Sequence, residues 1–214
     1  MAKIPLILKL KKESYKNIAK AQDIIVEELF KISDNAVLHG GTGIWRCYKG
    51  NRFSEDVDVY IQKDAEKLNN IFENLMKRGF AIEKKKISEK SLYSNLRLDN
   101  LFVRFEAIFK TAKGELKEYE TVEGNLITVN CLSAGELIKE KIIAYSNRLK
   151  IRDLYDIFFL LRYVDDKKSV RRELMHFIRN FKKPLDEQNL RILIIEGLVP
   201  KVNDMLNYIQ REAK

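Results

Sequence analysis

The sequence predicts an α+β fold, with an N-terminal lobe built on a mixed β-sheet flanked by helices and a C-terminal α-helical lobe. Two patterns carry this prediction. Short runs that alternate between apolar and polar residues are concentrated between residues 36 and 130. From Ser133 onward the hydrophobic period changes to about 3.6 residues. The break near residue 130 therefore divides the chain into two expected domains, residues 1–130 and residues 131–214.

Local signals define the elements of the first lobe. Ser14 is the expected N-cap of the first helix, the Gly40-Gly41 pair is expected to form a turn between a strand and a helix start, and Gly79 is expected to end a helix. Amphipathic helices are predicted over residues 14–32 and 63–79. Strands are predicted over residues 36–39, 52–61, 80–88, 91–98, 101–109 and 125–130.

The second lobe is predicted to be helical throughout. Ser133 is the expected N-cap of its first helix, with Glu136 in the third position of a capping box. The expected helices cover residues 133–147, 150–164, 167–181, 186–197 and 200–213. Residues 139–183 hold thirteen Lys/Arg and six Asp/Glu, so +7 of the chain's net charge of +9 lies there. Such a field suits polyphosphate or a nucleic-acid backbone, although a set of solvated helix faces is the alternative.

Composition excludes several protein classes. The 214 residues are 45% hydrophobic and 10% aromatic, with nine Gly and three Pro, which is typical of a globular protein. No apolar run approaches the ~20 residues that span a bilayer, and no cleavage site for secretion follows the start. Cys47 and Cys131 lack the spacing of a disulfide framework or a metal site. We therefore expect a soluble, cytoplasmic protein that does not bind membranes.

A pair of carboxylates gives the strongest chemical signal. Asp56 and Asp58 lie at i and i+2 of a predicted strand, so both side chains project from one face while Val57, Val59 and Ile61 project from the other. Two ionised carboxylates at this spacing repel each other unless a cation neutralises them, and hard oxygen ligands suit Mg²⁺. The alternative is an exposed acidic strand face without a ligand.

Two neighbouring features extend this signal. The glycine turn offers backbone N–H groups that phosphate oxygens can approach closely, although paired glycines also occur in ordinary tight turns. Glu106 is the one acidic residue in an otherwise apolar run, where it is costly unless a metal or another cation compensates it. Arg104, two residues earlier on the same face, is the alternative compensating charge.

The combined motifs resemble a known family. His39-Gly40-Gly41-Thr42-x-x-x-Arg46 and Arg52-Phe53-Ser54-x-Asp56-x-Asp58 are similar to those of the AbiEii/AbiGii-type nucleotidyltransferase toxins, which belong to the polymerase-β-like superfamily. Lys141-x-x-Ala144-x-x-x-Arg148-x-Lys150-x-Arg152-Asp153-x-x-Asp156 is similar to the Lys-to-Arg-Asp helical signature of that family. The resemblance covers about residues 36–165.

The resemblance implies a nucleotidyltransferase lobe followed by a helical lobe, with the nucleotide between them. Phosphate contacts are implied at Gly40, Gly41, Thr42 and Ser54, and further nucleotide-binding residues are Arg46 and Arg148. Asp56 and Asp58 are implied to bind Mg²⁺, with Mn²⁺ as an alternative metal and Glu106 as a third ligand. The implied catalytic residues are Asp56, Asp58, Lys141, which neutralises the triphosphate, and Asp153.

The helical segment supports the same interpretation from its spacing alone. Lys141 and Arg148 are seven residues apart, close to two helical turns, so both can point to one side. Asp153 and Asp156 share a face at i and i+3. These two acids either take part in catalysis or form structural salt bridges with Arg152 or Lys150.

The main functional hypothesis is a Mg²⁺-dependent nucleotidyltransferase that moves NMP from an NTP to an acceptor and releases pyrophosphate. The resemblance suggests an RNA acceptor such as tRNA, and a toxin whose partner is an antitoxin protein. Two alternatives stay open. One is transfer to a small molecule or a protein hydroxyl, and the other is a non-catalytic module that binds nucleotide or RNA.

Overall fold

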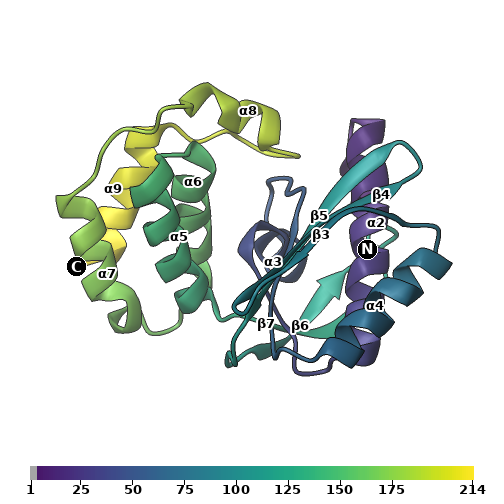
Figure 1. Cartoon of the computed structure of the whole chain (residues 1–214). Helices are drawn as coiled ribbons and strands as arrows, with labels where there is room; N and C mark the ends of the chain where they lie inside the picture. The colour runs from purple at the N-terminus through teal and green to yellow at the C-terminus, as the bar shows by residue number, and fades with distance from the viewer. Residues whose placement is uncertain (1–3) are drawn as a thin grey trace. The chain divides into compact units, whose positions relative to one another are not determined.

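The computed structural model describes residues 4–214. It divides into two compact units, which are described separately (Figure 1). The sheet unit consists of residues 4–49 and Phe53–Leu132, and the helical unit consists of Gly50–Arg52 and Ser133–Lys214. None of the helices within the described residues is both long and apolar enough to cross a membrane.

A seven-stranded mixed sheet forms the sheet unit, with the strand order β3-β4-β5-β2-β1-β7-β6. Two neighbouring pairs, β2 with β5 and β1 with β7, are parallel, and the other pairs are antiparallel. The strands are β1 (Val37–His39), β2 (Val57–Ile61), β3 (Ala81–Ile87), β4 (Ser91–Leu98), β5 (Leu101–Phe109), β6 (Glu115–Glu120) and β7 (Leu126–Cys131).

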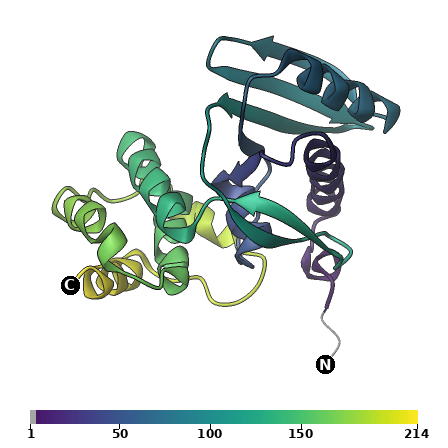
Figure 2. The ribbon, with the colours of Figure 1, turned by 90° about the horizontal axis from the view of Figure 1, so that it is seen from below.

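One face of the central strands is packed and the other carries charge. Val57, Val59 and Phe105 are buried on the packed face, where α2 (Glu13–Ile32) and α4 (Ala65–Lys77) cover the sheet side by side (Figures 1 and 2). Phe72 of α4 packs against Phe105 at a ring-centroid distance of 6.2 Å. The alternation expected around Asp56 and Asp58 is thereby confirmed, because their apolar neighbours form the core.

The remaining helices of the sheet unit are short. They are α1 (Leu6–Lys9) and α3 (Gly40–Cys47). The second of these follows β1 without an intervening residue and contacts β1, β2 and β6. Gly40 adopts a φ of +67°, so the chain turns sharply at the first residue of α3.

The helical unit packs α5 against α6 and α7, and α6 against α9. Its elements are α5 (Ala134–Arg148), α6 (Ile151–Leu160), the 3₁₀ turn η1 (Leu161–Tyr163), α7 (Lys168–Arg179), the 3₁₀ turn η2 (Glu187–Asn189), α8 (Leu190–Leu193) and α9 (Val202–Glu212). The expected N-cap of α5 is confirmed, since Ser133 Oγ accepts a hydrogen bond from the backbone N–H of Glu136 at 3.3 Å. Leu149 ends α5 in the left-handed conformation, with φ of 50°.

Several expected boundaries are wrong. The N-cap of α2 is Lys12, so Ser14 lies inside the first helical turn. The Gly40-Gly41 pair belongs to α3 and does not form a separate turn. Residues 52–56 lie outside the strand, which begins only at Val57. The helix expected over residues 186–197 is reduced to η2 and the four-residue α8, and β6 and α1 were not predicted.

Candidate functional site

Three carboxylates form an acidic cluster on the charged face of the sheet unit. The cluster consists of Asp56, Asp58 and Glu106. Asp58 of β2 and Glu106 of β5 are partners in the parallel strand register, so they are neighbours across the sheet. Asp56 immediately precedes β2. Residues that lie 48 positions apart in sequence are thus brought to one patch of the sheet.

Arg104 contacts two members of the acidic cluster. Its Nε donates to Asp56 Oδ1 at 2.8 Å, and its Nη2 donates to Asp56 Oδ2 at 2.5 Å. Arg104 Nη1 lies 3.8 Å from Glu106 Oε1. Arg104 therefore compensates Glu106 only in part, because the main partner of Arg104 is Asp56.

The electrostatics of Glu106 show how closely the negative charges converge. Partial burial raises the pKa of Glu106, and the neighbouring Asp58 and Asp56 raise it further, against the opposing effect of Arg104 and His39. A divalent cation would relieve this repulsion, and carboxylate oxygens are the donors that Mg²⁺ prefers. The carboxylate oxygens of the acidic cluster are therefore suitable donor atoms for Mg²⁺.

The cluster is not arranged as a ready metal site. Within residues 4–214, no group of three or more His, Cys, Asp or Glu side chains is placed to hold a metal ion. Arg104 engages both carboxylate oxygens of Asp56. A metal ion that binds all three acids must therefore displace Arg104 from Asp56.

The start of α3 brings the backbone against the acidic cluster. A Cβ atom at Gly40 would collide with Asp58 Oδ2 and would lie 3.0 Å from its Cγ. Together with the φ of +67°, this contact restricts the position to glycine. The main chain of Gly40 is therefore held beside a cluster carboxylate, which places the first N–H groups of α3 close to it.

Thr42 and Ser54 are held by a polar side chain from α2. Gln22 Nε2 donates to the Ser54 carbonyl oxygen at 2.9 Å and to Thr42 Oγ1 at 3.4 Å. The fully buried Thr42 Oγ1 in turn donates to the backbone carbonyl of Asp56. The Thr42 hydroxyl is thus engaged in positioning Asp56, and the phosphate contact expected at Thr42 stays a prediction. Gln22 was not predicted as part of the site, since its only signal in the sequence is a polar residue on a buried helix face.

Arg46 occupies the core of the sheet unit. Its side chain is paired with Asp23, donates to Tyr119 Oη at 3.1 Å and donates to the Ala19 carbonyl at 3.2 Å. The residue is 1% exposed. The guanidinium joins α2, α3 and β6 from inside, which favours a structural role for Arg46 over the expected nucleotide contact.

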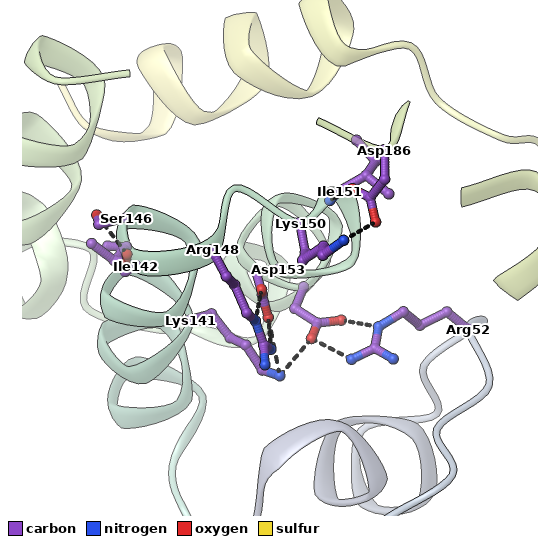
Figure 3. A network of polar contacts seen from close by, with 10 residues as sticks. Arg52, Lys141, Ile142, Ser146, Arg148, Lys150, Ile151, Asp153 and Asp186 are labelled. Atoms are coloured by element: carbon purple, nitrogen blue, oxygen red, sulfur yellow. Dashed lines mark hydrogen bonds and ion pairs between the residues drawn. The ribbon is translucent and has the colours of Figure 1, made fainter. Parts of the chain in front are cut away.

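The helical unit contains a second charged group, the buried ion network, which consists of Arg52, Lys141, Arg148, Asp153 and Asp156 (Figure 3). Asp156 accepts from Arg52 Nε and Nη2, each at 2.5 Å, and lies 2.9 Å from Lys141 Nζ. Asp153 accepts from Arg148 at 2.7 and 2.8 Å and lies 3.7 Å from Lys141 Nζ. Three cations therefore surround two fully buried carboxylates.

The cations decide the protonation state of Asp156. Burial alone raises the pKa of this carboxyl, but Arg52 and Lys141 more than offset burial and hold the pKa below its usual range. Asp156 is consequently an anion at neutral pH, bound to two positive partners. The network ties α5 and α6 to the short segment Gly50–Arg52.

The structure confirms one spacing argument in this region and contradicts another. Lys141 and Arg148 point to the same side of α5, since both contact Asp153. The expected pairing of Asp153 and Asp156 with Arg152 or Lys150 is wrong. Both acids face α5 instead, and Lys150 Nζ lies 3.6 Å from Asp186 (Figure 3).

Arg52 was missed as a member of the network. It precedes the Asp56/Asp58 pair by only a few residues, and its partner lies 104 residues away. Its place in the Arg-Phe-Ser motif was the only available signal.

Comparisons with known proteins identify a family and a shared fold. A family model described as "Nucleotidyl transferase AbiEii toxin, Type IV TA system" matches residues 25–204. JHP933 from Helicobacter pylori is similar in structure, with 17% identity, a TM-score of 0.66, and coverage of 94% of this chain and 91% of that chain. MenT4, a nucleotidyltransferase toxin from Mycobacterium tuberculosis, has 20% identity, a TM-score of 0.63, and coverage of 93% and 82%. These structures share the fold. No curated protein matches the sequence.

Proposed function

The chain belongs to the AbiEii family of nucleotidyltransferase toxins, and from this premise we propose that it transfers NMP from an NTP to RNA in a Mg²⁺-dependent reaction. The observation that carries the proposal is the acidic cluster beside Gly40. Three carboxylates converge there next to main-chain N–H groups, which is the combination that a metal-bound triphosphate requires. The Type IV toxin–antitoxin family further suggests an antitoxin partner.

Asp56 and Asp58 are the proposed metal ligands, and Glu106 is the proposed third ligand. When bound, a divalent metal ion stabilises negative charge on phosphate oxygens. Mn²⁺ is a suitable substitute because it prefers the same oxygen donors. Thr42 serves this site by holding the backbone of Asp56.

The glycine start of α3 is proposed to bind the phosphate chain. Gly40 and Gly41 offer N–H groups at the positive end of an eight-residue helix. Ser54, half-buried and fixed through its carbonyl by Gln22, is proposed to donate its hydroxyl to a phosphate oxygen. Each of these contacts stabilises negative charge during transfer to the acceptor hydroxyl.

The buried ion network is proposed to contribute Lys141, Arg148 and Asp153 to the reaction. Lys141 is nearly buried between Asp153 and Asp156, so its charge is already balanced and its proposed role is to orient Asp153. The Arg148 side chain is 43% exposed. It is therefore the cation of the network that can reach an anionic nucleotide without leaving its carboxylate partner.

The RNA acceptor is supported by the charge of the helical unit. Besides the +7 segment, this unit contains a cavity of about 480 Å³ whose polar lining includes His176, Arg179, Asn180 and Lys182. No acidic residue lines the cavity, and Phe181 contributes a half-buried aromatic ring. Cations beside an aromatic ring suit a single-stranded RNA segment.

Transfer assays test the proposed reaction. Wild-type protein is incubated with Mg²⁺, total RNA and each of the four α-labelled NTPs, in parallel with Asp58→Asn. Asp99→Asn, which changes an acid in an exposed turn, is the matched control. We expect RNA labelling by the wild type and the control only. Equal labelling by Asp58→Asn contradicts the proposed site, and label on protein or small molecules alone contradicts the RNA acceptor.

A binding experiment tests the RNA surface separately. We expect the double substitution Arg179→Ala with Lys182→Ala to weaken RNA binding. The slope of the logarithm of RNA affinity against the logarithm of salt concentration should become shallower by about one to two, because fewer counterions are released. Lys168→Ala with Arg171→Ala removes two exposed charges outside the cavity lining and is the control. Equal effects of both pairs would mean that charge acts diffusely and that the cavity is not a specific RNA site.

A further inference from the structure

Arg104 is placed differently from an ordinary surface arginine. It lies on the charged face of β5, its side chain is 45% exposed, and its guanidinium binds both oxygens of Asp56. Asp56 is one of the acids that the proposed function assigns to the metal. Arg104 and a divalent cation therefore compete for the carboxylate oxygens of Asp56.

The backbone of Arg104 is fixed while its side chain has room to move. β5 is paired on one side with β4, where Asn95 is opposite Arg104, and on the other side with β2. The guanidinium lies above this sheet at the open face, with Glu106 Oε1 3.8 Å away. Arg104 is thus held at the acidic cluster by a second, longer contact besides its two hydrogen bonds to Asp56.

The guanidinium has a second class of partner with the same geometry. Its planar fork matches a phosphate as well as a carboxylate, in both cases through two parallel N–H···O bonds. A metal ion that neutralises Asp56 removes the charge that holds Arg104. A nucleotide bound with a metal ion beside Asp56 would offer Arg104 phosphate oxygens in place of that carboxylate.

We propose that Arg104 is an exchangeable counter-ion, which binds Asp56 in the nucleotide-free protein and passes to the phosphates of the nucleotide when a divalent cation binds Asp56. The proposal rests on the proposed function, since it assumes that the acidic cluster holds a metal. It makes Arg104 a further nucleotide-binding residue. It also couples metal binding to nucleotide binding through one side chain.

Opposite changes in two affinities distinguish this role from a structural one. Without Arg104, Asp56 is unneutralised, so a divalent cation binds the nucleotide-free protein more tightly. The phosphate chain, in contrast, loses two charge-assisted hydrogen bonds and binds less tightly in the presence of metal. A residue that merely positions Asp56 would lower both affinities when it is removed.

The experiment uses Arg104→Gln and two probes. Mn²⁺ binding to the nucleotide-free protein is followed by electron paramagnetic resonance, and inorganic triphosphate binding at saturating Mg²⁺ is followed by calorimetry. Inorganic triphosphate avoids any dependence on the base. We expect the Mn²⁺ affinity to rise about three- to tenfold and the triphosphate affinity to fall about tenfold or more, as for the loss of a charge-assisted bond.

Arg97→Gln is the matched control. Arg97 lies on the adjacent β4, its side chain is 41% exposed, and it donates to Glu83 at 2.6 Å. It therefore has similar exposure and a similar carboxylate partner away from the acidic cluster. We expect neither affinity to change in this variant. Arg104→Lys, which keeps the charge but not the fork, is expected to fall between wild type and Arg104→Gln for triphosphate.

The outcomes separate the inference from the proposed function. If the wild type binds Mn²⁺ and Arg104→Gln lowers or leaves unchanged the Mn²⁺ affinity, the exchange is overturned and the metal site stands. An unchanged triphosphate affinity in Arg104→Gln also overturns the exchange. If the wild type binds no Mn²⁺ at all, both the exchange and the proposed metal site are overturned.

Discussion

Replacing Asp156 by asparagine should strongly destabilise the helical unit. The substitution keeps the shape of the side chain but removes the charge that faces Arg52 at 2.5 Å and Lys141 at 2.9 Å. Arg52 and Lys141 are buried, so water cannot replace the lost carboxylate. Removing one partner of a buried ion pair typically costs about 3–5 kcal/mol. We expect a loss of that size in the free energy of unfolding.

Urea unfolding at pH 7, followed by circular dichroism at 222 nm, measures the effect. Glu173→Gln is the control, because its ion-pair partner Arg172 is 92% exposed and the pair should contribute less than about 1 kcal/mol. An unfolding free energy of Asp156→Asn within about 0.5 kcal/mol of the wild type, a change typical of a neutral surface substitution, would refute the account of the buried ion network.

The wild type and Asp156→Asn should also differ in how their stability depends on pH. The folded-state pKa of Asp156 is lowered from its ordinary value of 3.8, so the carboxylate stabilises the fold above that pH. This contribution is lost as the pH falls through the folded-state pKa. We therefore expect wild-type stability to decline more steeply below about pH 4 than that of Asp156→Asn, as acid titration followed by circular dichroism would measure. Parallel acid-unfolding curves would contradict the predicted linkage.

Three further predictions concern the sheet unit. Gly40→Ala should abolish Mn²⁺ binding or strongly weaken it, because the added Cβ collides with the Asp58 carboxylate; wild-type affinity in electron paramagnetic resonance would contradict this. Mn²⁺ affinity should fall as the pH is lowered toward the raised pKa of Glu106, whose proton competes with the metal, and Glu106→Gln should flatten that pH profile. Arg46→Met should lower the melting temperature, since Asp23 loses its buried partner, while the folded fraction should bind inorganic triphosphate as the wild type does. Weaker triphosphate binding by folded Arg46→Met would instead indicate that Arg46 contacts the nucleotide directly.

Periodicity was sufficient for most of the fold. The alternation around Val57 and Val59 identified a strand with one apolar and one acidic face, because a packed sheet face excludes charge. The change of period at Ser133 marked the start of the helices, and its side chain caps α5 as expected. β6 escaped prediction because its strand is mostly charged and its burial begins only near Tyr119. The assignment of the two expected domains to separate functional roles stays a prediction.

Long-range pairing was the part that could not be predicted. The motifs identified Asp56 and Asp153 as important acids, but they did not reveal that Arg104 binds the first and Arg148 the second. Arg46 lies in a motif beside glycines, yet its side chain is buried in the core, where it is paired with Asp23 of α2. Spacing in one chain shows which residues share a face and does not show which partner lies opposite.

The segment Gly50–Arg52 has a consequence for dividing the protein into parts. It belongs to the helical unit although it lies within the sequence of the sheet unit, and Asn51 accepts a backbone hydrogen bond from Ile195 at 2.8 Å. A fragment made of residues 133–214 alone would lack Arg52 and leave Asp156 with Lys141 as its remaining cationic partner. Residues 133–214 therefore do not form a complete helical unit that can be exchanged between related proteins. A chimera that grafts it onto a related protein must carry the Gly50–Arg52 loop with it.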